Sequence, residues 1–329
     1  MEVGLKKIYS NLRGFSDILA NSELFRHIFI EDSKKEMSAW QIFIRAKNED
    51  TVVLNIDHQK LLKLCALRYL FPAKRFKLVS VDIILRKPFT PTQKILAYIK
   101  ATLLKKVDIF ILYFKNVDNY EKYFGISKEK IRYVPFKVNS WAEFSTYVAD
   151  PLNGDYVLCA GQTMRDLKTY IEAIKIVGLP AVLLTPGEMP MNKHGTQLIT
   201  EGLPANLRLV IDNSGKEEVF LNWIKNAAIV VIPRYSFDIA PSGISTYLCA
   251  MAAWRCVILS KGPGSQDLLT DGQAVLVEPE NVAQLADAIL LAWNDINLRK
   301  RVAIQGRRYA NQLKGKTRLL SDILKTLNT

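Results

Sequence analysis

The strongest constraint on this chain is the alternation of short apolar runs with longer segments of helical period. Residues 60–71 and 93–107 repeat apolar side chains at helical spacing, with Lys and Arg on the other side. The runs of strand composition in this half are 27–32, 51–57, 76–85, 107–114 and 130–136. Strands that alternate with helices in this way predict a parallel sheet covered by helices.

The same alternation restarts after a break at residues 137–154. This segment is rich in turn residues and ends in Asp-Pro and Asn-Gly, which is typical of an interdomain linker. The strand runs that follow it are 155–161, 181–186, 207–212, 227–233, 256–260 and 274–279, and the helical segments are 165–178, 217–227, 245–254 and 282–293. We therefore expect two doubly wound α/β domains facing across a cleft, formed by 1–140 and 141–310, and a helical tail over 311–329.

The composition agrees with a two-domain globular protein. The chain has 329 residues, of which 49% are hydrophobic and 23% are charged. No run of about 18 uncharged apolar residues predicts a membrane helix, and the N-terminus lacks the apolar core of a secretory signal. We expect a cytoplasmic protein whose four cysteines, none in CxxC spacing, are buried thiols. The three histidines lack the spacing of metal ligands, so neither a metal nor a cofactor is expected.

The positive charge is concentrated in the first half. Residues 1–150 carry 26 Lys and Arg against 16 Asp and Glu, whereas residues 151–329 carry 19 against 16. Within 51–106 the count is 12 basic against 2 acidic. An anionic membrane face, a phosphate-bearing acceptor and nucleic acid would each suit such a surface. Nucleic acid is the least favoured, because no recognisable nucleic-acid module accompanies the charge.

Two junctions between a strand and a helix are candidate anion sites, because ligands of open parallel sheets bind beyond the carboxyl ends of strands. At the first, Gly161 permits a tight turn and Arg165 precedes a helix. A cation is unfavourable at that end of the helix dipole, unless it reaches over a bound phosphate. The alternative is a solvated surface Arg beside a capping Asp. In both cases we expect Arg165 to be exposed, so that its replacement would hardly change stability.

At the second junction, Ser242, Gly243, Ile244 and Ser245 precede a helix. Unobstructed backbone amides at such a positive dipole end can hold a diphosphate. A plain helix cap is the alternative explanation. The long loop before this junction favours a binding site, since loops of this length often line one.

Residues 155–310 resemble the donor domain of the retaining GT-B glycosyltransferases of family 4. The elements of the pattern are Gly243, Ala250-Met251-Ala252, Cys256-Val257-Ile258, Gly264, Leu268, Asp271-Gly272, Val277, Pro279, Leu285-Ala286 and Ala288-Ile289. Residues 120–139 resemble the segment that ends the acceptor domain of that family. No GxGxxG follows any strand, which argues against another two-domain Rossmann enzyme that binds a dinucleotide.

The resemblance implies a metal-independent hexosyltransferase that moves a sugar, with retention, from a nucleotide-diphosphate donor. The acceptor would be a glycan or a lipid-linked molecule used in polysaccharide synthesis. Separately, the basic residues 51–106 predict peripheral association with the inner membrane face. By this resemblance the diphosphate would meet the amides of Gly243, Ile244 and Ser245. Arg165 would be the counter-cation, and Lys168 is the alternative cation.

The sequence departs from the family pattern at two places. The family has two glutamates eight positions apart, but here Cys249 occupies the second position and Asp238 is the carboxylate nearest to the first. A thiol cannot accept the two ribose hydrogen bonds that a carboxylate accepts, so a non-catalytic GT-B protein remains the alternative function. In the acceptor domain the family often has a His where this chain has Asp82. Asp82 and His58 both follow predicted strands, and either could contact the acceptor hydroxyl or be an ordinary loop residue.

Overall fold

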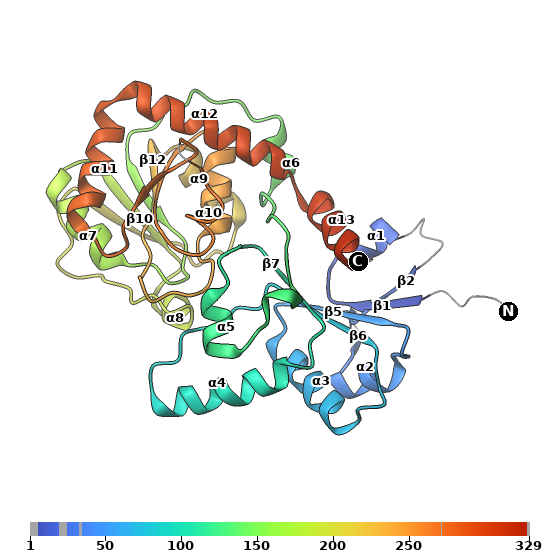
Figure 1. The fold of residues 1–329 in the computed structure, drawn as a ribbon. Helices are drawn as coiled ribbons and strands as arrows, with labels where there is room; N and C mark the ends of the chain where they lie inside the picture. The colour runs from blue at the N-terminus through green and yellow to red at the C-terminus, as the bar shows by residue number, and fades with distance from the viewer. Residues whose placement is uncertain (1–5, 20–24, 33–34, 271, 328–329) are drawn as a thin grey trace. The chain divides into compact units, whose positions relative to one another are not determined.

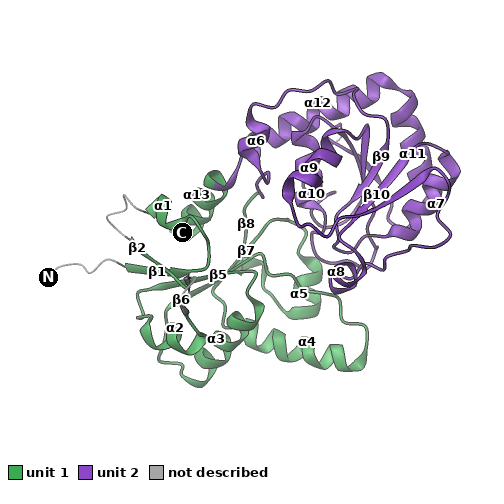
Figure 2. Cartoon of the chain, turned by 180° about the vertical axis from the view of Figure 1, so that it is seen from behind, with its two compact units in different colours: residues 1–135, 317–329 green, residues 136–316 purple. Residues whose placement is uncertain are grey.

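The computed structural model describes residues 6–19, 25–32, 35–270 and 272–327 of the chain (Figure 1). Asp271, part of the pattern quoted above, lies outside these ranges. The chain forms two compact units (Figure 2). Unit 1 contains Met1–Pro135 and Thr317–Thr329, and unit 2 contains Phe136–Lys316.

Unit 1 is built on a six-stranded parallel sheet with the order β2-β1-β5-β6-β7-β8. Its strands are β1 (Lys6–Ser10), β2 (Phe25–Phe29), β5 (Thr51–Asn55), β6 (Lys77–Val81), β7 (Ile109–Leu112) and β8 (Ile131–Tyr133). The sequence did not predict β1, which pairs with both β2 and β5. β3 (Glu31–Asp32) and β4 (Lys35–Glu36) form a separate short antiparallel pair.

Helices cover both faces of this sheet. The helices of unit 1 are α1 (Phe15–Leu19), α2 (Ala39–Arg45), α3 (His58–Leu70), α4 (Pro91–Leu104), α5 (Asp118–Phe124), a 3₁₀ turn (Lys128–Lys130) and α13 (Lys316–Leu327), whose first residue belongs to unit 2. α2, α3, α4 and α5 pack side by side in a row, whereas α1 and α13 lie on the opposite side of the sheet (Figure 1). Capping boxes fix the starts of α2 (Ser38, Gln41) and α4 (Thr90, Gln93).

Unit 2 has a second six-stranded parallel sheet, with the order β11-β10-β9-β12-β13-β14. Its strands are β9 (Val157–Ala160), β10 (Ala181–Thr185), β11 (Leu207–Ile211), β12 (Ile229–Ile232), β13 (Cys256–Ser260) and β14 (Val275–Val277). Its helices are α6 (Trp141–Ser145), α7 (Leu167–Val177), α8 (Glu188–Lys193), α9 (Glu217–Lys225), α10 (Ile244–Ala252), α11 (Val282–Asn294) and α12 (Ile296–Leu313). The order of strands reverses between β9 and β12, so a ligand site is expected at their carboxyl ends.

The turn-rich segment predicted as a linker packs closely on unit 2. The buried Arg255 guanidinium donates to the carbonyl oxygen of Asp150 at 2.9 Å, and Arg307 donates to that of Phe144 at 2.8 Å. At the other end of the unit, residues 317–329 group with unit 1, where the sequence had placed them in a separate tail. The Lys77 ammonium donates to the carbonyl oxygen of Leu327 at 2.9 Å and ties the last helix to the sheet of unit 1.

The interiors consist of the apolar strand runs that the sequence predicts. The central strands β9, β12 and β13 of unit 2 are buried at every residue, as expected for parallel strands covered on both faces. All four cysteines are buried and unpaired, which confirms the expectation for their burial. None of the helices in the described ranges combines the length and the apolarity needed to cross a membrane.

Candidate functional site

The loops that follow β9 and β12 meet at the switch point of unit 2. Arg165 follows β9 and Arg234 follows β12, and their backbones form an isolated antiparallel bridge. The amide of Asp166 also donates to the carbonyl oxygen of Pro233 at 3.3 Å. Two arginines are therefore brought together at the edge where the topology predicts a ligand.

Arg165 turns inward, and only 2% of its surface is exposed. Its Nε donates to the carbonyl oxygen of Ala160 at 3.1 Å, its Nη1 to that of Thr163 at 2.8 Å, and its Nη2 to Thr246 Oγ1 at 3.2 Å. The expectation of an exposed Arg165 was wrong. Gly161, with φ of 96°, makes room for the inward turn, because a Cβ there would lie 2.5 Å from Arg165 Nη2.

The Arg165 cation has no carboxylate of its own. Burial lowers its pKa to about 10, so the guanidinium remains charged at neutral pH. Among the residues that the structure describes, none forms an ion pair with it. The Asp166 carboxylate caps α7 by accepting from the Thr169 amide at 3.1 Å, and Asp238 pairs with Arg234 at 2.9 Å. The two buried arginines thus lie with two buried carboxylates, Asp166 and Asp238, but only Arg234 forms an ion pair, which leaves the Arg165 guanidinium positive and without a direct ionic partner.

The start of α10 adds to this positive charge. Gly243 is its N-cap, with φ of 97°, and no side chain caps the helix. No described residue accepts from the amides of Gly243, Ile244 or Ser245. A Cβ on Gly243 would lie 3.6 Å from Arg165 Nη1, so the guanidinium is next to the open helix end. Gly161, Gly243 and Ser245 are partly exposed, so the site is open to an anion from solvent.

Asp238, the carboxylate nearest to the missing glutamate, is held inside its own loop. Its Oδ2 accepts from Arg234 Nη2 at 2.9 Å and from Ser242 Oγ at 2.5 Å, and its Oδ1 accepts from the Ala240 amide at 3.0 Å. The Arg234 guanidinium also donates to the carbonyl oxygen of Pro263 at 2.6 Å. This buried cluster fixes the loop that leads to Gly243.

Lys168 and Cys249 lie on the two helices that flank the site. Lys168 is exposed in the first turn of α7 and has no ion pair or hydrogen bond with a described residue. Cys249 is buried in α10, with Sγ 4.0 Å from the carbonyl oxygen of Asn139, and burial raises the pKa of its thiol to about 12. The side-chain Nδ2 of Asn139 donates to Ser245 Oγ at 2.6 Å. At the position where the resemblance predicts a carboxylate, this chain therefore has a neutral thiol beside a backbone oxygen.

Unit 1 carries His58 and Asp82 at the carboxyl ends of the neighbouring strands β5 and β6. Asp82 and Ile56, each the first residue after its strand, have left-handed φ of 53° and 56°. Such backbone costs about 1–3 kcal/mol for a residue other than glycine and often marks functional sites. Here it is held by the Asp82 amide donating to the carbonyl oxygen of Ile111 at 2.9 Å, and by the Ile56 amide donating to that of Val81 at 3.1 Å.

The side chains of Asp82 and His58 have shifted pKa values. Burial raises the pKa of the Asp82 carboxyl to about 7, near neutral pH. For His58, burial and then the nearby Lys100 ammonium lower the pKa, so the imidazole is neutral at pH 7. The Asp82 carboxyl is therefore suited to exchange a proton near neutral pH, and the neutral His58 imidazole can accept a hydrogen bond from a hydroxyl.

The sequence interpretation missed several residues of the unit 2 site. They are Arg234, Thr196, Thr246 and Asn139. Thr196 Oγ1 accepts from the Arg165 amide at 2.7 Å. A signal was present for Arg234, because it follows the apolar run AAIVVIP at the same topological point as the Arg165 loop. Thr196 and Asn139 lie far along the chain from their partners, and no local pattern marks them.

Comparison with known proteins identifies the architecture. Residues 154–295 match the family model described as "Glycosyl transferases group 1". No match was found among curated proteins. Three solved structures share the fold over 98% of this chain. Anabaena Alr3699/HepE in complex with UDP is 13% identical, is covered over 100% of its own length and has a TM-score of 0.69. A glycosyltransferase from Rickettsia africae is 12% identical, covered over 98% and has a TM-score of 0.65, and sucrose-phosphate synthase from Thermosynechococcus elongatus is 13% identical, covered over 98% and has a TM-score of 0.66. The fold is GT-B, with two Rossmann-like units.

The shifted pKa of Asp82 makes a prediction about stability. A carboxyl whose pKa is higher in the folded than in the unfolded chain stabilises the fold below pH 4, and this contribution is lost as pH rises to about 7. Asp82→Asn removes the titration and keeps a residue that tolerates left-handed backbone. The variant should gain about 1–3 kcal/mol relative to wild type between pH 5 and pH 8. Urea unfolding across this range measures the gain. A difference that is constant with pH would contradict the shifted pKa.

Proposed function

We propose that this protein transfers a hexose from a nucleotide-diphosphate donor, and that the diphosphate binds between Arg165 and the start of α10. The observation that carries the proposal is the buried Arg165 cation, which lies without a carboxylate beside an uncapped helix N-terminus. The match to the group 1 family model covers this segment and supports the proposal. So does the structural likeness to Alr3699/HepE, which has been solved with UDP and with UDP-glucose.

The site suits electrostatic catalysis. Negative charge accumulates on the departing diphosphate as the sugar–phosphate bond breaks. The Arg165 guanidinium and the amides of Gly243, Ile244 and Ser245 are already oriented, so they stabilise that charge without reorganising. This set of groups needs no metal ion to neutralise the leaving group. In the proposed retaining reaction, the leaving phosphate oxygen takes the proton of the acceptor hydroxyl, and Asp82 or His58 orients that hydroxyl.

The second candidate is a non-catalytic GT-B protein that binds a nucleotide sugar or a protein partner. The specific observation in its favour is Cys249, a buried neutral thiol where the family has a ribose-binding carboxylate. Release of free nucleoside diphosphate from a panel of nucleotide sugars separates the two candidates, because only the transferase turns over.

Donor binding is testable by thermal unfolding in EDTA with UDP, GDP, ADP or pyrophosphate. At least one should raise the Tm of the wild type, because a ligand that binds only the folded state stabilises it by about 2.7 kcal/mol at 100 times its Kd. Arg165→Met should abolish this rise and lower turnover by about 10²-fold or more. The variant should also change the Tm of the free protein, since Arg165 is buried.

Lys168→Met is the matched control, because Lys168 is an exposed cation on the same helix end. Loss of the rise with Arg165→Met alone supports the geometry described above. Loss with Lys168→Met alone assigns the diphosphate to the other cation. If both variants respond to the diphosphates as the wild type does, the donor does not bind at this junction.

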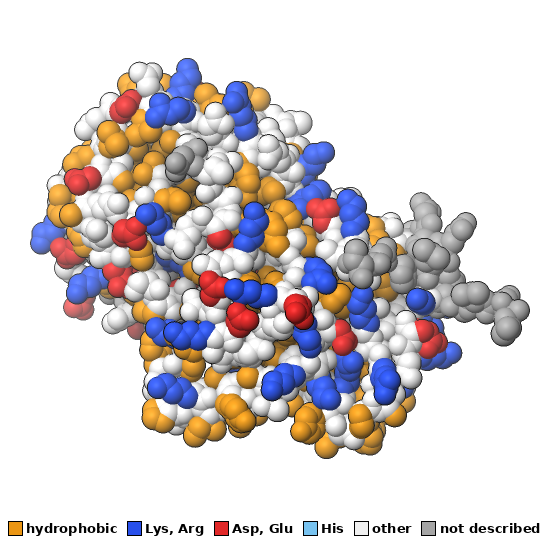
Figure 3. All heavy atoms as spheres, in the orientation of Figure 1, with side chains coloured by type: hydrophobic (Ala, Val, Ile, Leu, Met, Phe, Trp, Pro, Cys, Tyr) orange, Lys and Arg blue, Asp and Glu red, His pale blue; other side chains and the backbone are white. Residues whose placement is uncertain are grey.

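We also propose that unit 1 associates with an anionic membrane surface, such as the inner face of the cell membrane. α4 exposes Ile95, Leu96, Tyr98 and Ile99, of which Tyr98 is 76% exposed. The exposed apolar residues at the ends of α2 and α3 are Trp40, Ile44, Tyr69, Leu70 and Phe71. Figure 3 shows hydrophobic side chains interleaved with Lys and Arg along this edge of unit 1. Residues 84–106 contain six Lys and Arg and no Asp or Glu, so the edge complements an anionic bilayer.

Vesicle sedimentation tests the membrane proposal. Wild type should bind vesicles that contain anionic lipid and not neutral ones, and the binding should weaken with salt. Lys94→Gln should weaken it about fivefold, for a loss of about 1 kcal/mol, and Leu96→Ser should weaken it by more. Leu291→Ser, at an exposed position of unit 2, is the control and should bind as the wild type does. Equal binding to both vesicle types, or to neither, would contradict the proposal.

A further inference from the structure

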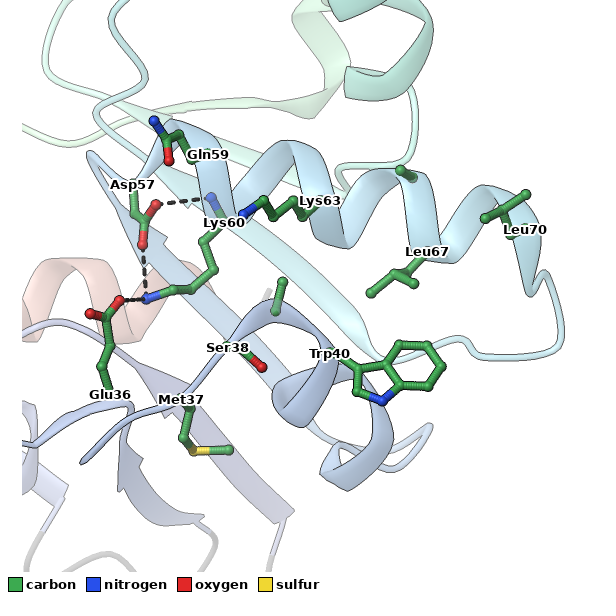
Figure 4. Close-up of a pocket in the computed structure, with 12 residues that line it drawn as sticks. Glu36, Met37, Ser38, Trp40, Asp57, Gln59, Lys60, Lys63, Leu67 and Leu70 are labelled. Atoms are coloured by element: carbon green, nitrogen blue, oxygen red, sulfur yellow. Dashed lines mark hydrogen bonds and ion pairs between the residues drawn. The ribbon is translucent and has the colours of Figure 1, made fainter.

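A cavity of about 700 Å³ lies between α2 and α3 of unit 1 (Figure 4). One of its walls is α3, and the other is the segment from Glu36 to Trp40 that leads into α2. The cavity begins beside Asp57, which caps α3 at the carboxyl end of β5, and extends along α3 to Leu70. It therefore starts at the strand edge that carries His58.

The two ends of the cavity differ in polarity. At the end near His58, the buried Lys60 ammonium pairs with Glu36 at 2.7 Å and with Asp57 at 3.0 Å, so its charge is satisfied. At the far end Figure 4 shows Trp40, Leu67 and Leu70 gathered together. Trp40 is 52% exposed and Leu70 is 69% exposed, and both belong to the apolar edge described above. A hydrocarbon chain would cover this end.

Lys63 lines the cavity between the two ends and is exposed. Unlike Lys60, it has no ion pair or hydrogen bond with a described residue. With a rise of 1.5 Å per residue, Lys63 lies about 7 Å along α3 from His58 and about 10 Å from Leu70. The unpaired Lys63 ammonium thus lies between the apolar end of the cavity and the strand edge that carries His58.

We propose that this groove binds the acceptor, and that the acceptor is a lipid phosphate. Its hydrocarbon chain lies over Trp40, Leu67 and Leu70, and its phosphate pairs with Lys63. The head group beyond the phosphate then extends toward His58. The role of the lipid as acceptor rests on the proposed glycosyl transfer, whereas the residues that bind it all belong to unit 1.

The charge and the shape of the groove favour this ligand over a protein helix. The volume of about 700 Å³ lies in the range of small-molecule sites. The apolar end opens on the surface proposed to meet the bilayer, so a lipid chain could enter without leaving an apolar environment. A groove for a protein helix would not require a phosphate, so comparing ligands with and without a phosphate distinguishes the two occupants.

The experiment is fluorescence quenching in the full-length chain by dodecyl phosphate brominated on its chain, used below its micelle concentration. Trp40 is the one tryptophan that the sequence places in unit 1, so quenching that Trp40→Phe abolishes reports on the groove. Lys63→Glu should weaken binding at least tenfold. Lys122→Glu, an equal charge change at an exposed position of α5 outside both the groove and the proposed membrane surface, should leave it unchanged. Brominated dodecanol, which lacks the phosphate, should bind at least tenfold more weakly than the phosphate.

Three results would overturn the proposal. They are the absence of quenching that depends on Trp40, equal weakening by Lys63→Glu and Lys122→Glu, and equal binding of the alcohol and the phosphate. The last result would indicate a general apolar groove for a protein helix. Because the donor diphosphate is tested separately on unit 2, failure of lipid binding leaves the donor assignment standing. Failure of donor binding with intact lipid binding would instead remove the glycosyl-transfer function and keep the lipid site.

Discussion

A buried guanidinium without its own carboxylate is the constraint around which the unit 2 site is arranged. Burying an ion costs several kcal/mol even after the protein relaxes, so such a charge persists only where hydrogen bonds or a counter-ion compensate for it. Three oxygen acceptors, from Ala160, Thr163 and Thr246, supply the hydrogen bonds to Arg165. No described residue forms an ion pair with the guanidinium, and the dipole of α10 adds positive charge of its own. In the proposed donor complex, a diphosphate would pair with the cation and accept from the row of amides.

The neighbouring loops keep this arrangement rigid. The ion pair between Arg234 and Asp238 lies beneath the loop that leads to Gly243, and Ser242 is bonded to the same carboxylate. Glycines occupy the positions where the guanidinium approaches the backbone most closely, at Gly161 and Gly243. Asp238, which the sequence suggested as a donor ligand, therefore fixes the conformation of its own loop. Unit 1 is built differently: its strand ends carry the Asp82 carboxyl, whose pKa burial raises to about 7, and the His58 imidazole, whose pKa burial lowers, and its helices present an apolar and basic edge.

Much of the fold could be predicted from the sequence, because buried parallel strands are continuous apolar runs. Every strand of the second sheet overlaps a predicted run. β1 was missed because KKIYS has two lysines and a short apolar core. α2 was missed although Ser38 and Gln41 form a capping box that the sequence shows. Further predictions failed at the level of single side chains: the inward turn of Arg165 depends on Thr246, which is 81 residues away along the chain.

The proposed donor site requires that a diphosphate binds at the backbone amides of α10. Backbone NMR spectra of the isotope-labelled protein, recorded as UDP or pyrophosphate is added, test this claim at the atoms concerned. We predict that the largest shifts occur at the amides of Gly243, Ile244 and Ser245 and at the Arg165 Nε–H. If the amides of α10 and the Arg165 side chain keep their shifts while other residues respond, the anion binds elsewhere and the start of α10 is not the diphosphate site.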